Sequence, residues 1–196
     1  GDGTQELIAY AQSPIQRGDQ EWRKLLVLDA RGQIVRQWEL PACGTTGEAP
    51  RMFPAVGNLD GLPDLEIVAI SGCHQISAYS LRKTDGPIWS VSLSGALLGS
   101  PVLGDLDHDG RNEIVLGAAM DARFSQGGVY VLNHRGEPWP NWPALGNESF
   151  AAAPALADFD GDGNLEICIP SWKSQKLHLL DQNGFEEIPI MSYAAK

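Results

Sequence analysis

One short acidic motif recurs along this chain of 196 residues and constrains its fold more than any other feature. The motif occurs three times in full, as GNLDGLPDLEI (57–67), GDLDHDGRNEI (104–114) and ADFDGDGNLEI (157–167), and once in shortened form as GDGTQEL (1–7). A segment that returns at intervals of roughly 50 residues indicates an array of equivalent structural units. The sequence therefore predicts a repeat protein with one acidic loop in each unit.

The second copy has the composition of a loop that binds a hard cation. Its carboxylates stand at positions 1, 3, 5 and 9 of the motif and belong to Asp105, Asp107, Asp109 and Glu113. Gly110 at position 6 permits the left-handed bend that gathers them, and Arg111 at position 7 offers its main-chain carbonyl. Carboxylates this close repel one another unless a divalent ion lies between them. Oxygen ligands alone favour calcium over zinc or magnesium.

The other copies differ in how many of these ligands they keep. The third is complete and predicts as ligands Asp158, Asp160, Asp162, Glu166 and the carbonyl of Asn164. The first has Leu62 at position 5, which leaves Asn58, Asp60, Glu66 and, as a substitute at position 7, Asp64. The shortened copy keeps only Asp2, Thr4 and Glu6. We expect two well-formed calcium sites, a degenerate one that is weak or empty, and a truncated one.

Short apolar segments flank each loop and predict β-strands. FPAV (53–56) and EIVAI (66–70) bracket the first full copy, and similar β-branched segments bracket the other two. An EF-hand would instead carry its last glutamate at position 12 and helices on both sides. Each loop is therefore expected at the tip of a β-hairpin. A second pair of strands, joined by a glycine-containing turn, is expected within 24–40, 75–93, 128–143 and 176–190.

These strands combine into units of four antiparallel strands, the composition of a propeller blade. The expected fold is all-β, a single β-propeller segment over 1–196 with about four blades, at 1–40, 53–93, 100–142 and 153–190. The first blade lacks its first strand. We expect the segment to be part of a larger propeller, with further blades or a partner chain completing the first blade. A closed four-bladed ring is the alternative.

The loops and their flanking strands resemble the FG-GAP and VCBS repeats of integrin α-subunit-like β-propellers. In that family a D-x-D-x-D-G-x-x-D/E loop binds calcium between the first two strands of a blade, and residues 105–113 and 158–166 match this pattern. Leu62 and the shortened copy depart from it. The resemblance implies a calcium-binding propeller. It implies no single function, because such propellers serve in adhesion, in scaffolding and in a few enzymes.

The chain is acidic, with a formal net charge of −11, and many of its acids lie in the loops. Such a surface repels nucleic acid. No apolar run is long enough to cross a bilayer, so we expect no membrane insertion of this segment. A calcium requirement suits the millimolar calcium outside the cytoplasm, and we expect an extracellular, cell-surface or periplasmic protein.

Cysteine usage bears on the same question of compartment. In a propeller, Cys43 would lie in the connection that enters the first full blade and Cys73 in a turn of that blade, on the same face. A disulfide between them is one hypothesis, and a pair of free thiols is the other. Cys168, between two isoleucines of a predicted strand, is expected to be a small core residue.

Ligand binding is expected on the face opposite the calcium loops. The predicted loops there carry aromatic and basic side chains typical of protein or glycan recognition, namely Trp22, His74, Arg123, Phe124, Trp172 and Lys173. Packing between blades is the alternative for the tryptophans. Arg17-Gly18-Asp19 and the sequon at Asn147 are left open as attachment and glycosylation sites.

No catalytic motif accompanies these features. The four histidines lack metal-site spacing, and there is neither a nucleophile elbow nor a phosphate-binding loop. The sequence favours a non-enzymatic module for adhesion, protein–protein interaction or surface assembly, and leaves enzymatic activity open. The alternative is a propeller domain of a calcium-dependent polysaccharide lyase or another carbohydrate-active enzyme. A third hypothesis, a quinoprotein-like propeller, rests on LDARGQIVRQW (28–38) alone.

Overall fold

The computed structural model describes residues 5–12, 22–41, 52–72, 74–83, 85–119 and 127–185, and the backbone of 190–192. These residues form β-strands and no helix, which confirms the all-β prediction. Among them, no helix is long and apolar enough to cross a bilayer.

The strands form four separate sheets in which all neighbours are antiparallel. The first sheet has the order β1 (Leu7–Gln12), β2 (Arg23–Leu28) and β3 (Ile34–Leu40). The second has the order β4 (Ala55–Gly57), β5 (Glu66–Ile70), β6 (Gln75–Tyr79) and β7 (Trp89–Ser92).

The third sheet is less regular than the second and fourth. Its strand β10 (Glu113–Ala119) pairs on one side with β11 (Gly127–Leu132) and on the other with both β8 (Ala96–Leu97) and β9 (Val102–Gly104). The fourth sheet has the order β12 (Ala155–Ala157), β13 (Glu166–Pro170), β14 (Lys176–Leu180) and β15 (Ile190–Ser192).

Beyond β11, where the sequence predicts a fourth strand, the structure has only two isolated bridges. They join Val129 to Ala144 and Leu132 to Pro138. The prolines at 138, 140 and 143 explain the difference, because a proline has no N–H to donate to a ladder. Strand β8 was not predicted, since two residues give no periodicity to detect.

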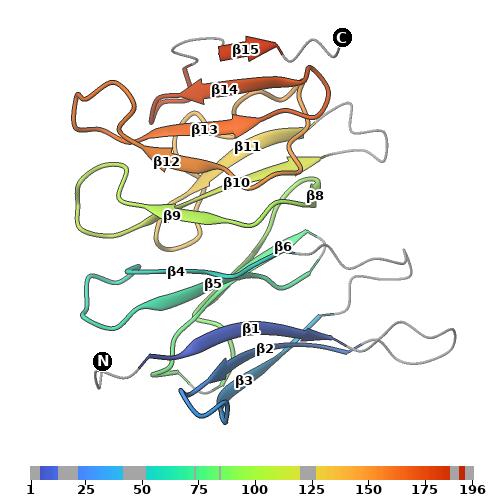
Figure 1. Cartoon of the computed structure of the whole chain (residues 1–196), viewed down its shortest axis with the longest axis vertical. Coiled ribbons are helices and arrows are strands. Elements are labelled where there is room, and N and C mark those ends of the chain that lie inside the picture. The colour runs from blue at the N-terminus through green and yellow to red at the C-terminus, as the bar shows by residue number, and fades with distance from the viewer. Residues whose placement is uncertain are drawn as a thin grey trace, which may run out of the picture.

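The four sheets stand face to face in a row that follows the order of the chain (Figure 1). Because β5 and β10 have a sheet on each side, both of their faces are buried, and their sequences EIVAI and EIVLGAA are continuously apolar after the glutamate. Three apolar clusters fill the spaces between successive sheets. The hydrophobic core is thus a series of layers, one at each sheet-to-sheet junction.

Tryptophan side chains tie neighbouring sheets together. Trp89 Nε1 of the second sheet donates to the carbonyl of His134 in the third (3.1 Å), and Trp142 Nε1 donates to the carbonyl of Gln182 in the fourth (3.2 Å). Both acceptors lie in equivalent turns, just after β11 and β14. The ring of Trp89 lies so close to the receiving turn that a Cβ on Gly136 would be 2.7 Å from Cε3. This joint therefore needs a glycine in the turn.

Candidate metal centres

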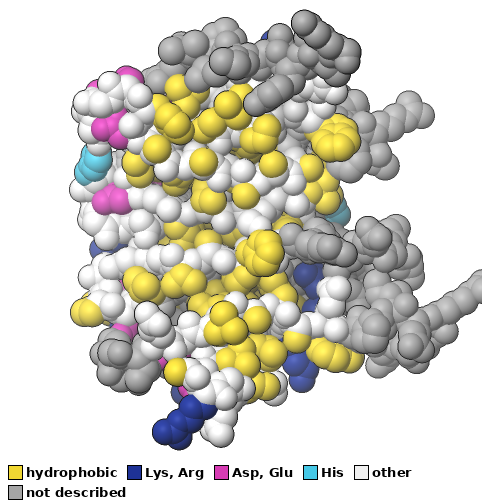
Figure 2. All heavy atoms as spheres, viewed as in Figure 1, with side chains coloured by type: hydrophobic (Ala, Val, Ile, Leu, Met, Phe, Trp, Pro, Cys, Tyr) yellow, Lys and Arg dark blue, Asp and Glu magenta, His cyan; other side chains and the backbone are white. Residues whose placement is uncertain are grey.

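The three full acidic motifs join β4 to β5, β9 to β10 and β12 to β13. As predicted, each lies at the tip of a hairpin, and the three tips follow one another along the same edge of the row (Figure 1). Aspartate and glutamate side chains gather at this edge of the molecular surface (Figure 2). The loops therefore form one acidic border.

Left-handed residues curl the second and third loops tightly. The φ angle at position 6 is 84° at Gly110 and 94° at Gly163, and the angle at position 4 is 60° at His108 and 83° at Gly161. Glycine adopts such angles without strain. The bend predicted at Gly110 is confirmed, and His108 is exposed.

The aspartate at position 1 organises each of these two loops from within. The carboxylate of Asp105 accepts main-chain N–H bonds from Asp109 and Gly110, both at 3.0 Å. Asp158 likewise accepts from Gly161 (2.6 Å) and Gly163 (3.1 Å). Such bonds to the charged carboxylate hold the chain in a ring around it.

The glutamate at position 9 begins the strand that leaves each loop and is buried in all three. Glu66, Glu113 and Glu166 have 0%, 1% and 2% of their surface exposed. One oxygen, Oε2, accepts the main-chain N–H of position 2, at 3.0 Å from Leu59, 2.9 Å from Leu106 and 2.6 Å from Phe159. This bond fixes the carboxylate and leaves Oε1 for another partner.

In the described part of the chain, two groups of acidic side chains could hold a metal ion. In one group, carboxylate oxygens of Asp105, Asp107 and Glu113 all lie within 4.8 Å of one another. In the other, the same holds for Asp158, Asp160 and Glu166. The structure thus brings together positions 1, 3 and 9 of both complete motifs.

The aspartates at position 5 are not members of these groups. Asp109 accepts the N–H of Arg111 and Asp162 accepts that of Asn164, each at 2.8 Å, so both carboxylates stabilise the turn at position 7. These two bonds place positions 5 and 7 beside each other. Metal ligation by Asp109, Asp162 and the carbonyls of Arg111 and Asn164 stays a prediction.

The electrostatics of the second loop favour a bound cation. Burial raises the pKa of Glu113 to about 7. The hydrogen bond from the N–H of Leu106 opposes this rise. The negative charges of the three loop aspartates, Asp107, Asp109 and Asp105, add to it. Two carboxylates at this separation repel by roughly 3–4 kcal/mol at an effective dielectric of 20. A divalent ion among the oxygens would offset this repulsion, so the residues fit a cation site.

The first loop is built differently. Its Asp60, Asp64 and Glu66 all face one guanidinium, that of Arg82, with N–O distances of 3.5, 3.1 and 3.7 Å. Burial raises the pKa of Glu66, and the positive charge of Arg82 partly opposes the rise. Asn58 closes the loop with its amide, accepting from the N–H of Gly61 (2.7 Å) and donating to the carbonyl of Leu62 (2.9 Å).

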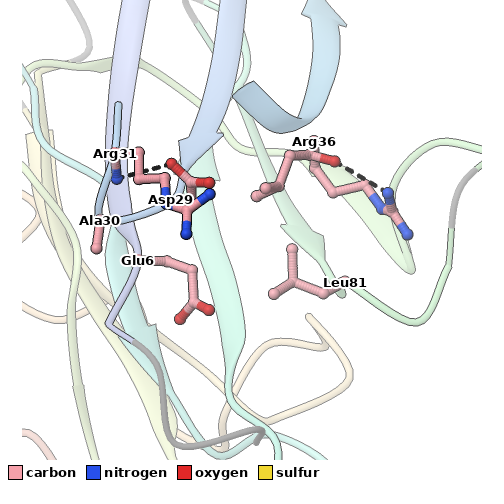
Figure 3. A pocket seen from close by; sticks show the side chains of 7 residues that line it. Glu6, Asp29, Ala30, Arg31, Arg36 and Leu81 are labelled. Atoms are coloured by element: carbon pink, nitrogen blue, oxygen red, sulfur yellow. Dashed lines mark hydrogen bonds between the residues drawn. The ribbon is translucent and has the colours of Figure 1, made fainter. Parts of the chain in front are cut away.

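Of the shortened copy, the structure describes only the end. Glu6 is exposed, unlike the glutamates at its equivalent positions, and Asp2 and Thr4 lie outside the described residues. Glu6 lines a cavity of about 490 Å³ together with Asp29, Arg31, Arg36 and Leu81 (Figure 3). Asp29 itself holds the adjoining turn by accepting the N–H of Arg31 at 2.8 Å. The described residues therefore form a cavity here and no cluster of acids that could hold a metal ion.

The residues predicted for ligand recognition lie at the end of the strands opposite the acidic loops. His74 joins β5 to β6, Trp172 and Lys173 join β13 to β14, and Trp22 directly precedes β2. Trp172 and Trp22 have 67% and 45% of their surface exposed. These side chains come from three different sheets, and their role in ligand recognition stays a prediction.

Several sequence-based predictions fall outside the described residues or concern single cysteines. Arg123, Phe124, Cys43, Cys73 and the tripeptide at 17–19 lie outside, so the disulfide hypothesis stays a prediction. Cys168 is a free thiol in β13 and only half-buried, because its side chain faces away from the neighbouring third sheet.

Comparisons with known proteins agree with this picture of the fold. No curated protein sequence matches the chain. Among solved structures, the chain is similar to the Vibrio cholerae biofilm matrix protein Bap1 (TM-score 0.57, 16% identity, 88% of this chain and 26% of that one). It is also similar to a protein of unknown function from Bacteroides caccae (TM-score 0.53, 12% identity, 97% of this chain and 60% of that one). The chain thus spans less than two thirds of either protein.

At such identities these likenesses establish the fold alone. A family model adds sequence-level information, since the FG-GAP repeat model matches residues 99–132. This segment contains β9, the second acidic loop, β10 and β11. The predicted resemblance is therefore confirmed, and the chain carries an FG-GAP repeat at residues 99–132.

Proposed function

We propose that the chain is a calcium-stabilised β-propeller segment that acts outside the cytoplasm as a non-enzymatic module for adhesion or surface assembly. The observation that carries the proposal is the gathering of three carboxylates in each complete loop, at Asp105, Asp107, Glu113 and at Asp158, Asp160, Glu166. Calcium would bind at these two loops and neutralise part of the excess negative charge.

The donor set supports calcium as the ion. Both groups consist of carboxylates, without histidine or cysteine, and calcium prefers six to eight oxygen ligands in flexible geometry. Zinc sites contain nitrogen or sulfur ligands, and magnesium retains several waters. The position-5 aspartates and position-7 carbonyls would complete the coordination, as in the family pattern that the loops resemble.

The propeller and its setting are supported by the architecture. Four antiparallel sheets packed face to face, with equivalent loops along one edge, are what successive blades present. Bap1 is a biofilm matrix protein by its name. A comparable extracellular role for this chain is our proposal. Open calcium loops of this kind function where calcium is millimolar.

For recognition of a protein or glycan partner, we propose the loops opposite the acidic border. Trp22 and Trp172 expose large aromatic surfaces there, and Lys173 lies beside Trp172. Exposed aromatic and basic side chains on loops commonly contribute most of the binding energy of an interface. The partner would then contact a surface separate from the calcium sites.

Calorimetric titration with calcium, combined with melting in calcium and in chelator, tests the metal assignment. We expect the parent protein to bind two calcium ions and to melt at a lower temperature in chelator. Each bound ion adds about 2.7 kcal/mol to the free energy of unfolding when free calcium is 100 times the dissociation constant.

The double variant Asp107→Ala, Asp160→Ala should lose both the calcium binding and the change in melting temperature. Asp85→Ala, which removes an exposed aspartate outside the loops, is the matched control. Equal chelator sensitivity in the double variant and the parent would reject the assignment.

A separate assay addresses the absence of catalysis. Acidic polysaccharides are incubated with the protein in calcium, and unsaturated sugar is followed by its ultraviolet absorbance. We expect no release over a broad panel of substrates. Release that depends on the protein would instead favour a polysaccharide lyase.

A further inference from the structure

We propose that Arg82 is the built-in cation of the first acidic loop, so that this loop holds its shape without calcium. The assignment of calcium to the other two loops rests on the proposed function. The role of Arg82 rests on the geometry of the first loop alone. Its guanidinium reaches the carboxylates of Asp60, Asp64 and Glu66 at 3.5, 3.1 and 3.7 Å. These are positions 3, 7 and 9 of the motif, which in a complete loop would surround the ion.

Arg82 supplies the positive charge that the buried carboxylate of Glu66 needs. Glu66 has no exposed surface, and its Oε2 is bonded to the N–H of Leu59. Its Oε1 is buried and has no hydrogen-bond partner, so the charge of Arg82 at 3.7 Å is the counter-charge for this oxygen. A buried carboxylate without a nearby positive charge is strongly destabilising.

The backbone of the first loop also differs from that of a calcium loop. Position 6 is Pro63, where the complete loops have a glycine with φ of 84° or 94°. Proline fixes φ near −65° and has no N–H, so it can neither bend the chain in this way nor donate to position 1 as Gly110 and Gly163 do. Leu62 removes the ligand at position 5. The loop has thus lost the ligand at position 5 and the bend at position 6, although Gly61 (φ 76°) keeps the bend at position 4.

Further positive charge faces the same loop from the next sheet. A cavity of about 320 Å³ beside Asp60 and Glu66 is also lined by Arg111 and Arg135, which carry this charge, and by His134, whose Nε2 lies 3.3 Å from Nη1 of Arg111. Arg111 lies against the first loop, since a Cβ on Gly61 would be 3.6 Å from its Nε. A calcium ion entering here would meet this positive charge as well as Arg82.

The chain provides a matched control for Arg82. Arg31 occupies the same place in the turn after β2 that Arg82 occupies in the turn after β6. No ion pair of Arg31 occurs among the described residues, and Arg31 does not line the cavity beside Asp60 and Glu66, so it shares the turn position and charge of Arg82 without its acidic partners. A comparison of Arg82→Ala with Arg31→Ala therefore isolates the contacts with the first loop.

Two measurements on the whole chain test the proposal. The first is hydrogen–deuterium exchange of peptides covering 57–67, 104–114 and 157–167, with calcium and with chelator. Calcium should slow exchange in the second and third peptides and much less in the first, where Asn58 is bonded to Asn112 of the second loop. Slowing of the first peptide to the same extent would overturn the proposal.

The second measurement is the melting temperature in chelator, where calcium plays no part. Arg82→Ala should melt lower than the parent by roughly 3–8 °C, and Arg31→Ala within about 1 °C of it. Arg82→Lys keeps the charge but loses the planar fork, so its melting temperature should lie between those of the parent and Arg82→Ala.

If Arg82→Ala is too unstable to purify, Arg82→Gln replaces it. Equal melting of the two alanine variants would refute the role of Arg82. Failure of the parent to bind calcium would instead reject the proposed function and leave this comparison valid.

Discussion

Asn58 and Asn112 are joined by two hydrogen bonds that connect the first acidic loop to the second. The side-chain Oδ1 of Asn112 accepts the N–H of Asn58 (2.8 Å), and the N–H of Asn112 donates to the carbonyl of Asn58 (2.7 Å). A Cβ on Gly57 would be 2.6 Å from the same Oδ1, so the approach requires glycine there. The two loops are therefore mechanically linked, although we propose a bound ion for only one of them.

Replacing Asn112 by alanine tests this link. The change leaves the partly buried N–H of Asn58 without its acceptor, and we expect the free energy of unfolding in saturating calcium to fall by about 1–2 kcal/mol. Urea denaturation measures it. Asn183→Ala, at an exposed asparagine bonded only to nearby residues, should change it by less than about 0.5 kcal/mol. Equal losses in the two variants would argue against the link.

The tryptophan joint between the third and fourth sheets gives a second prediction. Trp142 is buried, with 7% of its surface exposed, and its Nε1 donates to Gln182. Trp142→Ala should lower the free energy of unfolding by about 3–5 kcal/mol through the lost packing. Trp142→Phe should lower it by about 1 kcal/mol or slightly more, chiefly through the lost hydrogen bond. Trp172→Ala, at an exposed tryptophan, is the control and should cost less than either.

The close packing around Gly117, in the middle of β10, predicts how one added methyl group changes the stability of the protein. A Cβ there would lie 2.5 Å from the Cβ of Phe150, which is fully buried. Gly117→Ala should therefore destabilise the protein by about 1–3 kcal/mol by overpacking. Gly146→Ala, where the nearest atom is 3.9 Å away, should be nearly neutral by the same urea assay. A neutral Gly117→Ala would mean that β10 and the segment around Phe150 can separate freely.

The partly buried hydroxyl of Tyr10 predicts that the stability of the protein changes at alkaline pH. Its hydroxyl donates to the carbonyl of Ile70 at 3.3 Å, across the junction of the first two sheets, and burial raises its pKa well above the ordinary value of 10.0. A raised pKa means that the stabilising effect is complete below the pKa of the unfolded chain and is lost as pH rises through the folded pKa.

Tyr10→Phe should accordingly be less stable than the parent near pH 8 by about 1 kcal/mol, because it lacks the hydrogen bond. As pH rises to about 11, the parent should lose this advantage, since unfolding then releases the Tyr10 proton and the variant has none to release. Urea denaturation of both proteins at the two pH values measures the difference. A difference that stays constant with pH would contradict the raised pKa.

The sequence was sufficient for features that depend on neighbouring residues. Alternating aspartates and Gly110 predicted the curled loop, and the apolar segments around it predicted the hairpin that the structure contains. Both follow from local chemistry, because the φ preference of glycine and the pairing of adjacent strands need no distant partner.

Contacts between distant residues could not be predicted in this way. Arg31, Arg82 and Arg135 occupy equivalent turns and look alike in sequence, yet only Arg82 pairs with an acidic loop among the described residues. The signal that could have drawn attention to it is indirect: Leu62 and Pro63 leave the first loop short of a ligand and a bend. An acidic loop that lacks these still needs a counter-charge, and the fold determines where it comes from.

The tryptophan joints also bear on how such a chain can lengthen. The indole belongs to the earlier sheet and the receiving turn to the later one, as at Trp89 with His134 and at Trp142 with Gln182. The third unit therefore carries both halves of the contact, the receiving turn at His134 and the indole of Trp142. A tandem gene duplication of this unit would add a sheet able to bond to both neighbours at once, with no compensating mutation elsewhere. Each copy would then be free to diverge in its own loop, and the first loop, with its arginine, would be one outcome of that history.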